Sequence, residues 1–388
     1  MTKQRLRVLW LAAGIAALAA LAAGLGVGQA ATQGTEAAPS PLRAACGDKI
    51  VIQTDWFPEP EHGAVYQLAG AKGSVDKGKG RYTGTIGKTG VKLEIRAGGP
   101  FTGFQQPISQ LYQDSEITLG FATSDEQIQL SKKLPLVSIV APFEFSPQIL
   151  MWNPAKLKIT KWQDIEKSGA KVLVFAGGAW IEYLIDRGWI NKSQVDTSYD
   201  GSPARFAASD GNIVQQGFVT SEPYQYQHDI AQYGKPVSYL LLRSSGYAPY
   251  PQTLAARASD IKTKAACFKL LVPLVQQAQI DYVTNPGPIN AKLEEIVTAL
   301  NTFWRLSPAG DAYNVATQKK LGLVQNGPNC TLGDFNTKRL QGVINQVLPI
   351  FKKKGLDTIK DDLKASDIAT NQFIDPRIGL PTKTCKKT

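Results

Sequence analysis

The sequence predicts an α/β protein built as two lobes, and three features support this. From residue 49 onward, short apolar stretches of strand length alternate with amphipathic stretches of helical spacing, as in a mostly parallel sheet covered by helices. Two stretches, 142–147 and 243–251, interrupt this alternation with prolines. We interpret them as the outward and return crossings between two units. The 388 residues, 43% of them hydrophobic, are enough to bury a substantial core.

The chain begins with a pattern typical of a secretory signal peptide. Lys3, Arg5 and Arg7 precede the wholly apolar residues 8–27, and mostly small residues follow at 28–31. We therefore expect residues 1–31 to be a signal peptide and the protein to be exported to the periplasm or the outer face of the cell envelope. An apolar stretch of about 20 residues is also long enough to remain as an uncleaved membrane anchor. Residues 32–45 are poor in apolar side chains, which predicts a flexible leader.

The first lobe is expected to comprise residues 46–142 and 245–388, and the second lobe residues 143–244. Helices are expected near His62, from residue 123, from residue 162 and over 180–188, and the first lobe should end in a helical C-terminal part. Strands are expected at 49–54, 91–97, 117–122, 136–141, 148–152, 171–175, 212–220 and 237–242. Long helices are expected at 261–283, 291–306 and 337–351. Because Phe303 and Trp304 continue the helical spacing of the second of these, they are assigned to the core.

Cys46, Cys267, Cys330 and Cys385 are an even number of cysteines in a chain predicted to be exported, which predicts two disulfides. Three connectivities are possible, and the sequence does not distinguish them. Their spacing includes no Cys-x-x-Cys and no neighbouring histidine, so we expect no zinc site at the cysteines. Because His62 and His228 are the only histidines, we expect no other metal either, and we expect no cofactor.

The formal net charge of +11 arises from 43 Lys and Arg against 32 Asp and Glu. The lysines are scattered, and the densest group, residues 352–354, lies at a predicted helix end, where it complements the helix dipole. Because no nucleic-acid-binding motif accompanies the charge, we expect no nucleic-acid partner.

Three loops that follow predicted strands concentrate polar and aromatic residues, and ligands of open α/β sheets bind beyond the carboxyl ends of strands. Residues 55–63 combine two aromatics, three carboxylates and a histidine, which suits a flat ligand stacked on Trp56, although a rigid connector would look the same. Residues 175–180 form a glycine-bearing turn after a strand. The turn either binds an anion or a carbonyl group through its backbone N–H groups, or is only a tight turn without a ligand. In residues 215–224, Glu222 either binds a ligand amine or interacts with a helix dipole. The candidate ligand-binding residues are Asp55, Trp56, Phe57, Glu59, Glu61, His62, Phe101, Thr102, Gly178, Trp180, Tyr199, Glu222 and Tyr224.

The sequence resembles the substrate-binding proteins of ABC importers for sulfonates, nitrate and thiamine precursors, and within them the pyrimidine-precursor and riboflavin-type branch. That branch has a Trp-x-Pro…His-x-Gly pattern, which Trp56-Phe57-Pro58 and His62 match, and residues 164–175 and 217–224 are similar as well. The resemblance covers roughly residues 48–300. It implies a type II periplasmic-binding-protein fold, in which two α/β lobes are joined by a two-strand hinge, here with a helical C-terminal extension.

The match also departs from this pattern in two places. The glycine falls one residue early, at Gly63, and Ala64 occupies the family position. Glu59 and Glu61 bracket Pro60 where the family commonly has an asparagine. These carboxylates favour a ligand with hydrogen-bond donors or positive charge and disfavour nitrate, sulfonate or taurine.

The resemblance implies a binding protein that captures a small aromatic or heterocyclic nitrogen compound, pyrimidine- or flavin-like, and delivers it to an ABC permease in the cell membrane. We expect a monomer and no enzymatic activity, because the sequence has no G-x-S-x-G, H-E-x-x-H or Walker loop. The alternative is an envelope enzyme of the same fold that acts on a small heterocycle.

Overall fold

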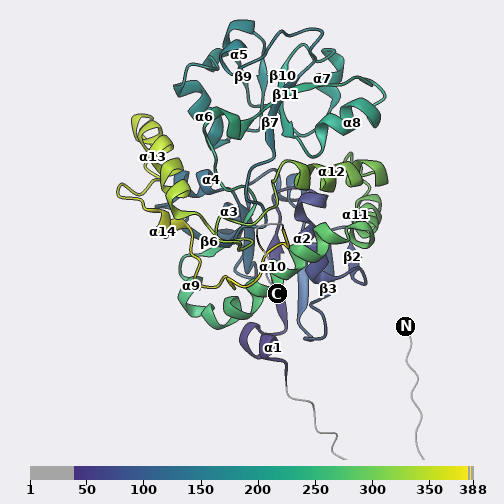
Figure 1. Cartoon of the computed structure of the whole chain (residues 1–388), viewed down its shortest axis with the longest axis vertical. Coiled ribbons are helices and arrows are strands. Elements are labelled where there is room, and N and C mark those ends of the chain that lie inside the picture. The colour runs from purple at the N-terminus through teal and green to yellow at the C-terminus, as the bar shows by residue number, and fades with distance from the viewer. Residues whose placement is uncertain (1–38, 383–384, 386–388) are drawn as a thin grey trace, which may run out of the picture. The chain divides into compact units, whose positions relative to one another are not determined.

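Two β-sheets organise residues 39–382 and 385, the part of the chain that the computed structural model describes. The predicted signal peptide lies outside these residues. The first sheet has seven strands in the order β2-β3-β4-β1-β5-β12-β6, and the second has five in the order β11-β7-β10-β8-β9. Figure 1 shows the first sheet in the lower half of the view and the second in the upper half. Within the described residues, we find no helix of the length and apolarity required to cross a bilayer.

Lobe 1 consists of the seven-stranded sheet and the helices that pack on it. Its strands are β1 (Lys49–Gln53), β2 (Ser74–Asp76), β3 (Arg81–Thr85), β4 (Lys92–Arg96), β5 (Leu119–Ala122), β6 (Leu136–Val140) and β12 (Thr253–Arg257). Its helices are α1 (Pro41–Cys46), η1 (Pro60–His62), α2 (Gly63–Ala69), η2 (Gly99–Thr102), α3 (Pro107–Gln113), α4 (Ser124–Gln129), α9 (Asp260–Thr263), α10 (Ala265–Thr284) and α11 (Gly287–Leu300).

Lobe 2 consists of the five-stranded sheet and four shorter α-helices. Its strands are β7 (Gln148–Trp152), β8 (Val172–Leu173), β9 (Val195–Asp196), β10 (Val214–Phe218) and β11 (Ser238–Leu241). Its helices are α5 (Gln163–Ser168), α6 (Ala179–Asp186), η3 (Lys192–Gln194), α7 (Ala204–Ala208) and α8 (Glu222–His228).

The two lobes are connected by residues 141–147 and by residues 242–252, the second of which includes η4 (Leu242–Ser245). Strand β7 enters lobe 2 after the first crossing, and β12 re-enters the lobe 1 sheet after the second, between β5 and β6. The fold class predicted from the sequence, two α/β lobes with a hinge, is confirmed.

The expectation of a mostly parallel sheet is wrong. In lobe 1, β4, β1 and β5 are parallel neighbours, whereas the pairs at both ends of the sheet are antiparallel. The hairpin of β2 and β3 makes one end antiparallel, because a short turn reverses the chain. Strand β12 makes the other end antiparallel because it returns from lobe 2 in the opposite direction.

The residues from 301 onward, here called the C-terminal extension, contact both lobes. The extension contains α12 (Pro308–Lys320), α13 (Thr337–Lys353) and α14 (Ala365–Ile368). Helix α12 packs against η1 of lobe 1 and α8 of lobe 2, and α13 packs against α4 of lobe 1 and α6 of lobe 2 (Figure 1). Arg339 on α13 forms a 2.6 Å ion pair with Glu144 in the first crossing. The extension is therefore a third structural connection between the lobes.

Two local predictions are corrected by the structure. The helix expected over 291–306 ends at Leu300, because Asn301 adopts a left-handed conformation with φ 49° that terminates it. Part of the flexible leader expected over 32–45 is helical: α1 begins at Pro41 with a side-chain cap from Ser40, and residues 32–38 lie outside the described part of the chain. Leu42 is buried against the core, which helps to hold this short segment as a helix.

All four cysteines form disulfides, as predicted. Cys46 in α1 is bonded to Cys267 in α10, and Cys330 is bonded to Cys385 within the C-terminal extension. The first bond fixes α1 to lobe 1, and the second closes the end of the extension.

Candidate ligand-binding cleft

A cavity of about 420 Å³ lies between the two lobes and is lined by residues of both. From lobe 1 it takes the loops after β1, β4 and β5, the three neighbouring parallel strands, whose carboxyl ends meet at one edge of the sheet. From lobe 2 it takes the loops after β8, β9 and β10, which are also parallel neighbours. Ligands of open α/β sheets bind at such edges, so the topology itself indicates a binding cleft.

The loop after β1 is fixed before it reaches the cleft. Gly98 N donates a 2.9 Å hydrogen bond to the carbonyl oxygen of Trp56, and the Thr54 hydroxyl donates one of 2.7 Å to the same atom. Pro58 and Pro60 restrict the backbone that follows. The loop therefore presents Asp55, Trp56 and Glu59 to the cavity in a defined geometry.

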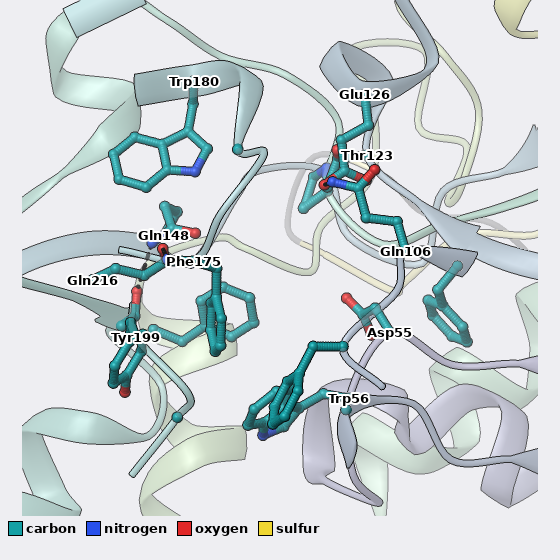
Figure 2. Close-up of a pocket in the computed structure, with 18 of the residues that line it drawn as sticks. Asp55, Trp56, Gln106, Thr123, Glu126, Gln148, Phe175, Trp180, Tyr199 and Gln216 are labelled. Carbon is teal, nitrogen blue, oxygen red and sulfur yellow. Dashed lines mark hydrogen bonds between the residues drawn. The ribbon is translucent and has the colours of Figure 1, made fainter. Parts of the chain in front are cut away.

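Aromatic rings from both lobes meet at one end of the cleft. Trp56 of lobe 1 lies with its ring centroid 5.3 Å from that of Phe175 in lobe 2. Phe175 in turn lies 4.7 Å from Tyr199, and Trp56 lies 5.9 Å from Trp304. Figure 2 shows Phe175, Tyr199 and Trp180 on one side of the cavity and Trp56 facing them. A flat ligand in this cavity would meet ring faces from both lobes.

Six carboxyl side chains line the cleft, and none of its lining residues, all of which the structure describes, is Lys or Arg. The carboxyl residues are Asp55, Glu59, Asp125, Glu126, Asp200 and Glu222. Together with the aromatic rings they make the cavity both flat-sided and acidic.

Burial raises the pKa values of several of these carboxyls. Burial, followed by the charges of Asp125 and Asp55, raises the pKa of Glu126 to about 8. Burial also raises the pKa of Glu222 to about 7, against a hydrogen bond from the Phe218 N–H to its Oε2. The pKa of Glu59 is raised well above its ordinary value by burial and by the nearby carboxylates. A positive ligand would relieve the cost of ionising these groups.

Glutamine amides on both sides of the cleft are held by defined partners. Gln106 Nε2 donates a 2.9 Å hydrogen bond to Glu126 Oε1, and Gln216 Oε1 accepts one of 2.9 Å from the Phe175 N–H. Gln148 Nε2 donates to the Gly217 carbonyl at 3.2 Å. These side chains are oriented in advance and offer their remaining polar atoms to a ligand (Figure 2).

The structure brings seven of the thirteen sequence-predicted site residues to the cleft. These are Asp55, Trp56, Glu59, Gly178, Trp180, Tyr199 and Glu222. They come from both lobes.

Six predicted site residues do not line the cavity. Phe57 is fully buried beneath Trp56 and stacks on Trp304, with ring centroids 5.9 Å apart. Phe101 packs edge-on against Phe57 in the same apolar cluster. Tyr224 packs against Tyr313 of the C-terminal extension instead.

The other three are polar residues that form hydrogen bonds within the protein instead of facing the cavity. Thr102 Oγ1 donates to the Gly99 carbonyl at 3.1 Å and stabilises the η2 turn. Glu61 Oε1 accepts hydrogen bonds from Thr220, Ser221 (3.1 Å) and Asn314 (2.8 Å), so it joins lobe 1, lobe 2 and the extension. His62 is fully buried behind Asp55, with Nε2 2.7 Å from Asp55 Oδ1.

Several lining residues were not predicted from the sequence. Asp125 and Glu126 follow β5, and the rule that selected the loop after β1 would have selected them too. Phe104 follows η2 without a motif. Trp304, assigned to the core, is buried there with Phe57 and Val297, and its ring also lines the cleft. Phe303, assigned to the core as well, is exposed, because the helix ends at Leu300.

The early glycine of the first motif has a packing reason. A Cβ atom on Gly63 would lie 2.0 Å from the ring of Tyr282 on α10. Real side chains never approach so closely, so the first residue of α2 must be glycine for α10 to pack where it does. The position is structural and lies away from the cleft.

No protein-family profile matches this chain, and no curated protein matches it. Solved structures do. The periplasmic aliphatic sulphonate-binding protein SsuA of Escherichia coli aligns over 87% of this chain and 96% of its own, with 15% identity and a TM-score of 0.53. The alkanesulfonate-binding protein SsuA of Xanthomonas axonopodis pv. citri, bound to MOPS, aligns over 83% and 99%, with 12% identity and a TM-score of 0.51.

A third match is the ligand-binding component of an ABC-type import system from Staphylococcus aureus. It aligns over 84% of this chain and 97% of its own, with 11% identity and a TM-score of 0.50. The fold is that of the periplasmic binding proteins. At these identities the likeness concerns architecture, and the ligand has to be inferred from the cleft itself.

Proposed function

We propose that this chain is an exported solute-binding protein that captures a small, positively charged or donor-rich aromatic nitrogen heterocycle, pyrimidine- or flavin-like, and delivers it to an ABC permease. The observation that carries the proposal is the composition of the cleft: aromatic rings from both lobes, six carboxyls and no Lys or Arg among its lining residues. Such a lining suits the stacked face and the N–H edge of a protonated ring.

The same composition opposes an anionic ligand. A sulfonate or nitrate buried without a cationic partner would lie near carboxyls whose own ionisation is already unfavourable. The two SsuA proteins are named for sulfonates, and we propose a different ligand class for this chain despite the shared fold.

The proposed mechanism is closure of the two lobes on the solute. Because both lobes contribute many of the lining residues, the complete set of contacts exists only when the lobes are close together. The permease would recognise this closed form, as hinged binding proteins present a changed surface on closure. Export, a monomeric state and a permease partner belong to this proposal.

Native mass spectrometry of protein purified without added solute, followed by thermal shift measurements, tests the proposal. We expect one co-purifying molecule, released chemically unchanged, and stabilisation by cationic aminopyrimidines or flavins but not by taurine or alkanesulfonates. Stabilisation by sulfonates alone would refute the ligand class. Conversion of the bound molecule to a product would instead indicate an enzyme.

Trp56→Ala provides the site-specific test, with Trp189→Ala as the matched control. Trp56 lies against aromatic rings of both lobes, whereas Trp189 packs on Trp162 in lobe 2, away from the cleft. Loss of one aromatic face should weaken solute binding roughly tenfold. Equal weakening by both variants in calorimetric titrations would show that the cleft is not the binding site.

A further inference from the structure

A histidine and two carboxylates converge on one point at the lobe 1 wall of the cleft. Asp55, Glu59 and His62 each offer one ligand atom, and these atoms lie within 4.8 Å of one another. His62 Nε2 is 2.7 Å from Asp55 Oδ1 and 3.6 Å from Glu59 Oε1. The loop after β1 and the η1 turn place all three within eight consecutive residues.

A fourth polar side chain points into the same group from the second crossing between the lobes. Gln252 is 1% exposed, and its Nε2 lies 3.4 Å from Asp55 Oδ1, 3.5 Å from Glu59 Oε1 and 3.3 Å from His62 Nε2. Among the described residues, its Oε1 has no hydrogen-bond partner. Its backbone is left-handed, with φ 39°, which is uncommon for a residue with a side chain and indicates that its surroundings hold it in place.

The distances fit the first coordination sphere of a transition-metal ion. An ion with ligand bonds of about 2.1 Å in a tetrahedron holds its ligand atoms about 3.4 Å apart. The distances from His62 Nε2 and Gln252 Nε2 to Asp55 Oδ1 and Glu59 Oε1, and the distance between the two nitrogens, run from 2.7 Å to 3.6 Å. They bracket the value for a tetrahedral site. A half-turn of the Gln252 amide exchanges its nitrogen and oxygen, which brings the unpartnered Oε1 to the fourth corner.

We propose that Asp55, Glu59 and His62, with Gln252 Oε1 as the fourth ligand, form a binding site for a divalent first-row ion such as Zn²⁺. One imidazole nitrogen and two or three oxygens suit zinc, manganese or cobalt better than calcium or magnesium, which favour six or more oxygen ligands. The ion would also neutralise two carboxylates that no Lys or Arg approaches among the residues lining the cavity.

The site is accessible from the cleft. The Asp55 side chain is 29% exposed, and both Asp55 and Glu59 line the cavity. An ion held there would lie next to the captured solute, and displacement of the Gln252 amide would free one coordination position for it. This inference goes beyond the proposed function, because it concerns the ion alone and holds for any solute.

The inference is tested by equilibrium dialysis of the full chain, prepared without a histidine tag, against Zn²⁺. Mass spectrometry then measures the number of metal ions bound per chain. We expect one Zn²⁺ per chain. Asp55→Asn and Glu59→Gln, which preserve side-chain size, should each weaken binding by at least about tenfold. Glu166→Gln, which alters an exposed carboxyl on α5, and His228→Gln, which alters the other histidine, should leave binding unchanged.

Absence of binding by the unaltered chain, or equal loss in the Glu166→Gln control, would overturn the inference. A Co²⁺ titration of the unaltered chain keeps the test independent of whether the variants fold. The visible spectrum of four-coordinate Co²⁺, abolished by added Zn²⁺, would support the site, and the spectrum of hydrated Co²⁺ alone would refute it. Because neither assay contains an organic solute, failure here leaves the proposed function standing.

Discussion

Replacing Glu126 by glutamine should remove part of the pH dependence of stability of the solute-free protein. Burial, Asp125 and Asp55 raise the pKa of this carboxyl from 4.5 to about 8 in the folded protein. The unfolded chain titrates near the ordinary value. Between about pH 4.5 and 8 the folded state therefore holds a proton that the unfolded state has lost, and the free energy of unfolding falls as the pH rises through this window.

The size of the effect follows from the width of the window. Each pH unit contributes about 1.4 kcal/mol per proton, which gives an upper value of about 5 kcal/mol. Because Glu126 is only partly buried, solvent reduces the cost of ionisation, and we expect about 2 kcal/mol. Glutamine preserves an acceptor oxygen for the 2.9 Å hydrogen bond from Gln106, so its packing should change little.

Urea denaturation of the two proteins at a series of pH values from about 5 to 9 measures the effect. The unaltered protein should lose about 2 kcal/mol more than Glu126→Gln over this range. Glu166→Gln, which changes an exposed carboxyl on α5, serves as the control and should follow the unaltered protein. Parallel curves for the unaltered protein and Glu126→Gln would refute the reasoning. A bound cation favours the carboxylate, so cation affinity should rise over the same window.

Gly63→Ala should lower the free energy of unfolding by about 3 kcal/mol, because the new Cβ would overlap a tyrosine ring; an unchanged urea midpoint would contradict the packing described. Replacing Cys46 and Cys267 together by serine should cost about 3 kcal/mol, measured in the same way under oxidising conditions, and an intact melting temperature would mean that the bond adds nothing. Asn314→Ala removes a 2.8 Å hydrogen bond to the buried carboxylate of Glu61 and should cost about 2 kcal/mol; a cost near zero would show that the extension is loosely attached.

The sequence predicts the lobes and the core strands because these depend on local periodicity. Strand β7 has its predicted bounds, and the helix predicted at 337–351 is α13, extended by two residues. Strand direction depends on contacts between distant segments, and so the antiparallel entry of β12 was missed.

In the candidate site, too, features that depend on local sequence were predicted, and features that depend on tertiary structure were not. Trp56 and Trp180 were found because each follows a strand with a recognisable motif. Phe57, one residue after Trp56, points to the core, and no pattern in the loop distinguishes the two orientations. Trp304 was missed because a single left-handed residue, Asn301, ends the preceding helix and redirects the chain toward the cleft.

The C-terminal extension has a consequence for how fast the proposed solute can leave the cleft. Helix α12 is hydrogen-bonded through Asn314 to Glu61 of lobe 1 and to Ser221 of lobe 2, and Lys354 at the end of α13 lies 2.5 Å from Glu182 of lobe 2. Rotation about the two crossings alone would break these contacts, so opening requires the extension to release one lobe first. We therefore expect slow exchange of bound solute, at a rate controlled by the C-terminal extension, and faster exchange when the contacts of the extension with lobe 2 are weakened.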